Sequence, residues 1–350
     1  MIIKTITADG FKNLKSVDIE LSPGLNLFVG ENAQGKTNLL ELLWVMTGVR
    51  SFRGASDKNF LGFDRDCIKT LITYRDFERD CILTYDSKKG EKLITVNGVQ
   101  VPRLSKLFGN LRAVIFTPDD LSLVSSEPSL RRAFLDLSIS QIKPGYAAVL
   151  HRYNKILAQR NAALKIQSRT DIWDEQLIKT GTHISIYRKT YVEILSRYAK
   201  KIYGEISGER ETLNIEYSSN VFKNFEYSHE HYKNRLSSHS EAEFRLGTTL
   251  VGIHRDDLNL TLDGLSVRDF ASQGQKRSSA LALKLSQAKI LAAETGDAPV
   301  ILLDDVLSEL DSRRKNFLLR DLEGFQTLIT SCERAVAGKT FTVKDGYIYA

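Results

Sequence analysis

The chain has 350 residues and lacks several features that would place it in a common protein class. No stretch approaches the roughly 20 apolar residues of a membrane-spanning helix, so no membrane protein is expected. Residues 1–11 mix polar and apolar side chains, which is typical of an edge or half-buried strand and not of a signal peptide. No internal repeat and no low-complexity tract is present, which argues against repeat-array architectures.

Cysteine is also scarce. Cys67, Cys81 and Cys332 make an odd count without the close spacing of a zinc site, so we expect reduced thiols in a cytoplasmic protein. Three histidines, His229, His231 and His239, fall in the polar segment 215–240. That segment is predicted to be a flexible connection, and its histidines are interpreted as solvated surface and not as metal ligands.

Charge is unevenly distributed along the chain. The formal net charge is +6, but residues 131–210 carry 15 Lys and Arg against 7 Asp and Glu, a net +8, whereas the rest carries a net −2. Such a concentration of positive charge in one segment is typical of proteins that bind a polyanion such as a nucleic acid. A long solvated helical surface, which is often rich in Lys and Arg, remains the alternative.

The first informative motif in the sequence is a complete phosphate-binding loop, G-x-x-x-x-G-K-T. Its residues are Gly30, Glu31, Asn32, Ala33, Gln34, Gly35, Lys36 and Thr37. A short apolar strand is predicted at 25–29 before the loop and an apolar helix at 37–46 after it, which is the context this loop requires. Lys36 would neutralise charge on the β- and γ-phosphates of ATP, and the Thr37 hydroxyl would ligate Mg²⁺.

A second motif follows four apolar residues at 300–303. The run predicts a buried parallel strand whose carboxyl end presents Asp304, which would hold Mg²⁺, and Asp305, which would polarise the attacking water as general base. Lys36 and Asp305 are therefore the predicted catalytic residues. A strand that simply runs into an acidic turn is the alternative.

A third motif, residues Ser272, Gln273, Gly274 and Gln275, precedes a helix predicted at about 276–293. The serine hydroxyl, the backbone amides and the helix N-terminus would form a second anion site. Two such sites could share one triphosphate if two copies of the chain faced each other, which predicts an ATP-dependent homodimer. An ordinary helix cap, with Ser272 capping and Gln275 three residues on, is the alternative.

Periodicity organises the rest of the chain. Residues 64–101 alternate polar and apolar side chains and predict an antiparallel β subdomain. From 129 to 207 the period becomes helical, and the aromatic stripes within it are interpreted as helix–helix core. We predict three segments: the first half of a head at 1–120, a helical arm at 121–245 and the second half of the head at 246–350.

These motifs together resemble the ABC-type ATPase superfamily, which includes the SMC proteins, and within it the RecF recombination mediator family. Shorter segments that also carry the resemblance are 11–14, 118–121, 131–136, 159–161 and 252–257. The resemblance implies an α/β fold, namely a P-loop ABC-type ATPase head with an antiparallel β subdomain and an inserted helical arm domain. It also implies that Lys12 and Asn13 touch the nucleotide. The segment 252–257 has no evident physical role.

The sequence departs from the superfamily pattern at two places. The strand after the acidic one ends in Thr330-Ser331-Cys332, where cassette transporters have a His, and Asp305 stands where a Glu is usual. A shorter carboxylate and a missing His together predict slow ATP hydrolysis, and the resemblance implies that this weak ATPase activity depends on DNA. The first departure favours a RecF-like protein over a transporter.

The resemblance further implies a DNA-binding protein that ATP dimerises into a clamp on duplex DNA near single-stranded gaps, where it assists RecA loading with RecR and RecO in DNA repair and replication restart. Candidate phosphate contacts in the basic segment are Arg131, Arg132, Arg152, Arg160, Arg188 and Lys189. A transporter motor, a soluble kinase and a DNA-independent ATPase of protein assembly remain alternatives.

Overall fold

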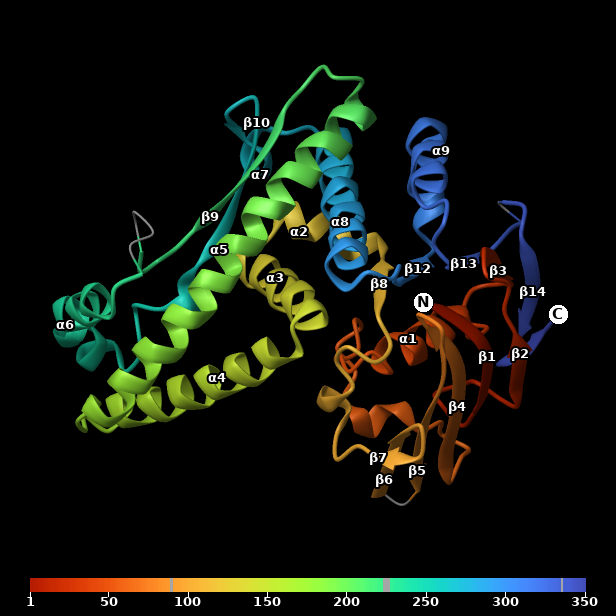
Figure 1. Cartoon of the computed structure of the whole chain (residues 1–350), viewed down its shortest axis with the longest axis horizontal. Helices are drawn as coiled ribbons and strands as arrows, with labels where there is room; N and C mark the ends of the chain where they lie inside the picture. The colour runs from red at the N-terminus through yellow and green to blue at the C-terminus, as the bar shows by residue number, and fades with distance from the viewer. Residues whose placement is uncertain (89–90, 223–226, 335) are drawn as a thin grey trace. The chain divides into compact units, whose positions relative to one another are not determined.

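The computed structural model describes residues 1–88, 91–222, 227–334 and 336–350 (Figure 1). It divides into two compact units, the first made of Met1–Asp120 and Gln287–Ala350, the second of Leu121–Ser286. The second unit is therefore an insertion in the first. Helix α8 (Gln273–Thr295) contributes its N-terminal part to the second unit and its C-terminal part to the first.

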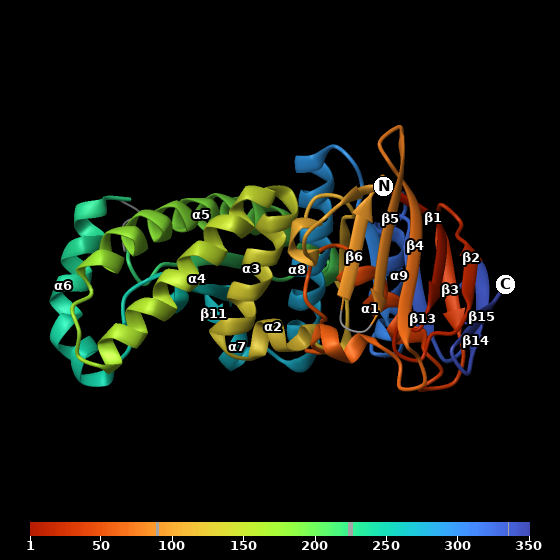
Figure 2. The same cartoon turned by 90° about the horizontal axis from the view of Figure 1, so that it is seen from below.

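One sheet of the first unit is antiparallel, with the strand order β2-β1-β4-β5-β6-β7 (Figure 2). Its strands are β1 (Ile2–Asp9), β2 (Val17–Glu20), β4 (Cys67–Asp76), β5 (Arg79–Lys88), β6 (Glu91–Val96) and β7 (Val99–Gln100). Alternate residues of β4, from Ile68 to Tyr74, are buried, whereas those between them face outward. The predicted antiparallel subdomain at 64–101 is confirmed, because its alternation places one face of each strand in the core.

The other sheet of the first unit has the order β15-β14-β3-β13-β12-β8, and all its neighbouring strands are parallel except β14 and β15. Its strands are β3 (Leu25–Val29), β8 (Ala113–Phe116), β12 (Val300–Asp304), β13 (Thr327–Ser331), β14 (Lys339–Lys344) and β15 (Tyr347–Tyr349). Because β3, β12 and β13 are parallel neighbours, their carboxyl ends meet at one edge of the sheet. The phosphate loop leaves β3 at this edge and enters α1 (Lys36–Val45), within a residue of the predicted helix.

The second unit is mostly helical, as predicted. Its helices, besides the start of α8, are α2 (Leu121–Ser125), α3 (Pro128–Ile142), α4 (Pro144–Lys165), α5 (Asp171–Ser207), α6 (His229–Leu246) and α7 (Val267–Phe270). Its small sheet has the order β11-β10-β9 and is formed by β9 (Leu213–Ser218), β10 (Asp257–Leu262) and β11 (Leu265–Ser266). Strand β9 runs alongside α5 (Figure 1). Tyr146, Tyr153, Tyr191 and Leu195 are buried, which supports the interpretation of the stripes as core.

Two expectations about this unit differ from the structure. The segment 215–240 does not form one connection, because β9 occupies its start and α6 begins at His229, where the Ser228 hydroxyl accepts a hydrogen bond from the backbone N–H of His231 at 3.3 Å. Residues 223–226 lie outside the described part. The predicted boundary at 245 falls inside the second unit, because β10 pairs with β9 along its length.

The remaining elements are short. Helix α9 spans Ser312–Asp321, and its first turn is capped by the Asp311 carboxylate, which accepts from the N–H of Arg314 at 2.9 Å. The 3-10 helices lie at Asp57–Phe60, Leu104–Lys106, Pro118–Asp120, Ile253–Arg255 and Val306–Ser308. Within the described ranges, no helix is both long and apolar enough to cross a bilayer.

Candidate functional site

The phosphate loop is shaped by two glycines that no other residue could replace without strain. Gly35 has φ 117°, and a Cβ there would lie 2.9 Å from Oδ1 of Asn13. A Cβ on Gly30 would lie 2.2 Å from the backbone oxygen of Val343 in the neighbouring strand β14. The loop therefore depends on the left-handed freedom of one glycine and on the close backbone approach that the other allows.

Lys36 opens helix α1 and is buried at 3% exposure. Its Nζ donates to the carbonyl oxygens of Gly30 at 2.5 Å and Glu31 at 3.3 Å, and it lies 3.4 Å from the Cys332 sulfur. The ammonium is therefore held inside the loop by neutral acceptors. A phosphate oxygen is a stronger partner, because both groups would be charged.

Two hard oxygens meet where β12 ends. The Thr37 hydroxyl donates to Oδ1 of Asp304 at 2.9 Å, although the two residues are 267 positions apart in the chain. Oδ1 of Asp304 also accepts from the Thr330 hydroxyl at 2.9 Å, and Thr330 Oγ1 accepts from the backbone N–H of Asp305 at 3.0 Å. Thr330 thus fixes both acidic residues from the neighbouring strand β13, and Asp305 itself has a left-handed backbone with φ 52°.

The electrostatics of this pair suit a divalent cation. Burial raises the pKa of Asp304, the hydrogen bonds from Thr37 and Thr330 lower it, and the neighbouring Asp305 carboxylate raises it further. A hydroxyl and a carboxylate are ligands that Mg²⁺ takes, and its charge would offset the cost of burying the carboxylate. The residues present therefore fit Mg²⁺, although no group of three or more His, Cys, Asp or Glu side chains is arranged for a metal within the described residues.

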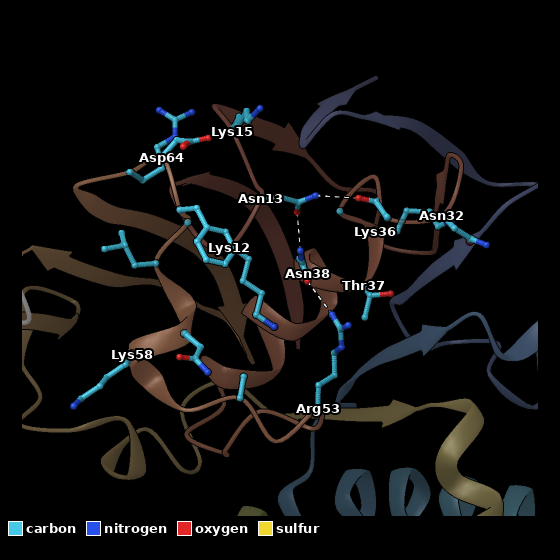
Figure 3. A pocket seen from close by; sticks show the side chains of 18 of the residues that line it. Lys12, Asn13, Lys15, Asn32, Lys36, Thr37, Asn38, Arg53, Lys58 and Asp64 are labelled. Atoms are coloured by element: carbon cyan, nitrogen blue, oxygen red, sulfur yellow. Dashed lines mark hydrogen bonds between the residues drawn. The ribbon is translucent and has the colours of Figure 1, made fainter.

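Lys12 and Asn13 lie beside the loop (Figure 3). Lys12 forms an ion pair with Glu41, a fully buried carboxylate that also accepts from the Ser51 hydroxyl at 2.6 Å. The Asn13 amide donates to the carbonyl of Ala33 at 3.2 Å, which ties Asn13 to the phosphate loop.

A hydrogen-bonded chain extends from Asn13 across the same site. Oδ1 of Asn13 accepts from the Asn38 amide at 2.7 Å, and Oδ1 of Asn38 accepts from Arg53 at 3.2 Å (Figure 3). Asn13 and Asn38 therefore connect the loop to Arg53, which lies in the segment between α1 and β4.

These residues line a cavity of about 1220 Å³ in the first unit. Its charged lining is Lys12, Lys15, Lys36, Arg53, Lys58, Arg65, Asp64 and Asp305. Six cations against two carboxylates favour a polyanionic ligand. Arg53, Lys58 and Arg65 were not predicted from the sequence as site residues. The one feature that could have indicated them is the number of basic residues in the segment between the first helix and the antiparallel strands.

The third motif lies in the second unit. The backbone N–H of Ser272 donates to Oε1 of Gln275 at 2.7 Å, and the N–H of Gln275 donates to the Ser272 hydroxyl oxygen at 3.3 Å. This reciprocal pair is a capping box. Ser272 is exposed, and its hydroxyl still has a proton to donate. The geometry therefore suits both the cap and the anion site.

Three of the predicted DNA contacts require a correction. Arg131, Arg160 and Arg188 are each 3% exposed or less. Arg131 forms a two-fold pair with Asp257 at 2.7 and 2.9 Å, and Arg160 bonds Asp174 at 2.6 Å. Buried, paired guanidinium groups cannot reach DNA phosphates without breaking these pairs, so their basic character is structural.

The other three predicted contacts are more accessible. Arg152 is exposed on α4, Lys189 is half-buried and pairs with Glu193 at 3.4 Å, and Arg132 donates to the carbonyl of Asp256 at 2.8 Å. Further exposed basic residues on α4 and α5 include Lys155, Arg197, Lys200 and Lys201. Helical spacing of three and four places the last three on one face of α5.

The segment 252–257 acquires a clear structural role. Asp256, 1% exposed, receives hydrogen bonds from Arg188 at 3.1 Å, from the backbone N–H of Asn220 at 2.8 Å and from the Tyr217 hydroxyl. Burial raises the pKa of Asp256, and the Arg188 guanidinium opposes that rise. The segment is thus a polar hub that joins α5, β9 and β10.

His254 belongs to the same hub and is held neutral. Its Nδ1 accepts from the Tyr153 hydroxyl at 2.9 Å, and its Nε2 donates to the carbonyl of Thr249 at 3.1 Å. Burial lowers the pKa of His254 to about 4, and nearby guanidinium groups lower it in the same direction.

A phosphate loop between a parallel strand and a helix, carboxylates at the end of a neighbouring strand, and a helical unit inserted between two halves of the fold define an ATPase head of the ABC and SMC type. A solved SMC head bound to the C-winged helix domain of ScpA has a TM-score of 0.59 and 16% identity, covering all of this chain and 96% of that one. That likeness concerns the fold alone, and it confirms the predicted fold class.

The chain belongs to the RecF family of this superfamily. A family model described as the RecF/RecN/SMC N terminal domain matches residues 2–344. Proteins named DNA replication and repair protein RecF from Clostridium botulinum (strain 657 / Type Ba4) and Agathobacter rectalis are 36% and 38% identical, covering 100% and 94% of this chain and 97% and 92% of those proteins. A solved RecF-ATPrS structure, described as a recombination mediator protein in the RecFOR pathway, has a TM-score of 0.93 and 38% identity, covering 99% of this chain and 97% of that one.

Proposed function

We propose that this protein is an ATP-dependent, DNA-binding recombination mediator that acts in DNA repair and replication. The observation that carries the proposal is the meeting of Lys36, Thr37 and Asp304 beside one basic cavity. Relatives named as DNA replication and repair proteins, and solved RecF structures with ATP and ATPrS, support the same function.

ATP binds with its phosphates in the loop from Gly30 to Thr37. Lys36 exchanges its carbonyl partners for phosphate oxygens, and the backbone N–H groups at the start of α1 face the same anion. Lys12, Asn13 and Arg53 are among the other residues that line the cavity. Thr37 and Asp304 hold Mg²⁺, which neutralises phosphate charge when bound.

Hydrolysis uses Asp305 as the base that orients water. Its backbone N–H is bonded to Thr330, which holds the residue in place at the edge of the cavity. Aspartate reaches less far than glutamate, and Cys332 stands where a transporter has histidine. We therefore expect a slow ATPase in which hydrolysis resets the complex.

ATP also joins two copies of the chain. Ser272 of one copy donates to the γ-phosphate held by Lys36 of the other, and the N-terminus of α8 adds its positive dipole end. The exposed Ser272 hydroxyl and the capping box that orders it support this role.

The dimer holds duplex DNA near single-stranded gaps in the cytoplasm and recruits RecR with RecO, so that RecA can load. Exposed cations on α4 and α5, represented by Arg152, Arg197 and Lys200, contact phosphates without reading the sequence. Binding should therefore weaken by about tenfold or more between ~50 and ~200 mM salt.

Sedimentation velocity tests this proposal in four states, each with Mg²⁺: no nucleotide, ADP, ATP, and ATP with a gapped duplex. We expect a monomer without nucleotide and a dimer that forms with ATP and then sediments with the DNA. Lys36→Ala should abolish both nucleotide binding and the dimer, whereas Ser272→Arg should block the dimer and leave nucleotide binding intact. A monomer in all four states, or a dimer that survives Ser272→Arg, would refute the ATP-driven clamp.

A further inference from the structure

Both the oxygen and the nitrogen of the Gln275 side-chain amide form hydrogen bonds. Its Oε1 accepts from the backbone N–H of Ser272 at 2.7 Å, and its Nε2 donates to Oε1 of Glu211 at 2.6 Å. An amide side chain bonded at only one end could rotate about its last bond. With both ends bonded, Gln275 has one orientation, and that orientation completes the capping box around Ser272.

Glu211 connects this cap to the long helix of the second unit. Its other oxygen, Oε2, accepts from the Tyr203 hydroxyl at 2.7 Å. Tyr203 is 1% exposed near the end of α5, and Glu211 lies two residues before β9 begins. A buried tyrosine thus fixes the carboxylate, and the carboxylate fixes Gln275.

The hydrogen bond from Gln275 to Glu211 has a charged acceptor. A carboxylate acceptor makes stronger hydrogen bonds than a neutral one, and Glu211 accepts two of them from neutral donors. No feature of the helix itself requires Glu211, because Ser272 and Gln275 already satisfy each other at the N-terminus of α8. The Gln275–Glu211 contact is therefore an addition to the capping box and not a part of it.

We propose that Glu211 is a positioning residue for the Ser272 anion site, linking the end of α5 to the residue that completes the nucleotide site of a second copy. This rests on the ATP-dependent dimer proposed above. α5 carries the exposed cations Arg197, Lys200 and Lys201 in its last turns, so the same link joins the basic face of the helix to the cap.

The first test uses hydrogen exchange of the full chain without nucleotide, which does not depend on dimerisation. In Glu211→Ala, the amides of residues 272–276 should lose protection, whereas Glu216→Ala, an exposed carboxylate on β9, should leave them unchanged. Glu211→Gln, which keeps an acceptor for Gln275, should lose less. Unchanged protection in Glu211→Ala would overturn the positioning role.

The second test measures function. In the presence of ATP and Mg²⁺, Glu211→Ala should weaken the dimer by about tenfold, because the Gln275 side chain that Glu211 holds in the monomer would have to be ordered when the dimer forms. Binding of a fluorescent ATP analogue to the monomer should stay unchanged, because Glu211 lies in the second unit and the cavity in the first. A double variant Glu211→Ala/Gln275→Ala should dimerise no worse than Gln275→Ala alone.

The exchange and dimerisation measurements test the role of Glu211 and the ATP-dependent dimer separately. A wild-type chain that stays monomeric with ATP would refute the proposed dimer, while the exchange experiment would still decide whether Glu211 orders the cap. A wild-type dimer that Glu211→Ala leaves at full strength would overturn the proposed role of Glu211 and leave the dimer standing.

Discussion

Replacing Arg188 by alanine should destabilise the second unit and not remove a DNA contact. Arg188 is 2% exposed, on the inner face of α5. Its guanidinium bonds both oxygens of Asp136 at 2.9–3.0 Å, Oδ2 of Asp256 at 3.1 Å and the carbonyl of Ile253 at 2.7 Å. The substitution would leave two carboxylates without their cation.

The expected loss of stability in Arg188→Ala follows from the burial of the Arg188 ion pairs. Removing one partner of a buried ion pair costs about 3–5 kcal/mol, because the remaining charge is left unpaired in a low dielectric. For a unit of this size, each kcal/mol lowers the Tm by about 2–4 °C, so we expect a fall of roughly 6–20 °C. Arg188→Lys should recover only part of this, since a single ammonium cannot bond two carboxylates in the same fork geometry.

The assay combines calorimetry with a salt titration of DNA binding. Arg152→Ala is the matched control, because Arg152 is exposed on α4. It should leave the Tm unchanged, weaken DNA binding and reduce the salt slope by about 1. Arg188→Ala should lower the Tm and, measured well below it, keep the wild-type salt slope. An unchanged Tm with a reduced salt slope in Arg188→Ala would refute the structural role.

Three further predictions concern other sites. His254 is half-buried and neutral, and since its folded pKa of about 4 lies below its usual value of 6.5, the stability it contributes is present above about pH 6.5 and is lost as the pH falls toward 4. In urea unfolding, the stability difference between the wild type and His254→Gln should fall by about 2 kcal/mol from pH 7.5 to 5, and an equal pH dependence in the two proteins would contradict this. Thr330→Val should slow ATP hydrolysis and raise the Mg²⁺ concentration that half-saturates nucleotide binding, because Asp304 loses a hydrogen-bond donor and the Asp305 N–H loses its acceptor. Thr330→Ser keeps the hydroxyl and should behave like the wild type. An equal Mg²⁺ dependence in the wild type and both variants would exclude a positioning role for Thr330. Gly30→Ala should cost about 1–3 kcal/mol or more and weaken nucleotide binding, because its Cβ would lie 2.2 Å from the oxygen of Val343. Gly145→Ala is the control, because Gly145 is exposed in α4, has no left-handed backbone and would place its Cβ within 4 Å of nothing. An unchanged Tm for Gly30→Ala would count against the close strand approach.

The elements that sequence predicted well are those whose signal is local. The strand before the phosphate loop, the helix after it and the alternating strands of 64–101 each follow from a periodicity within a few consecutive residues. The residues of the phosphate loop are adjacent in the chain, so their grouping needs no tertiary information. In contrast, 215–240 was predicted as a loop because its polar composition concealed an α6 that buries only a narrow stripe, which includes Tyr232 and Leu236.

Other features could come only from tertiary structure. A count of basic residues cannot distinguish the exposed Arg152 from the buried Arg131, whose partner Asp257 is 126 residues away. The same holds for Thr330, which reaches Asp304 only because β12 and β13 are parallel neighbours.

The sequence by itself determined the family, the ATPase head and the residues able to bind phosphate, because glycines, a lysine and a hydroxyl at fixed spacing already specify that chemistry. Tertiary structure decided which charges are available to a ligand. Burial makes a charge costly unless it is paired, so the fold assigned Arg131, Arg160 and Arg188 to internal carboxylates. It left exposed cations on α5 and several cations lining the cavity beside the phosphate loop for anions from outside.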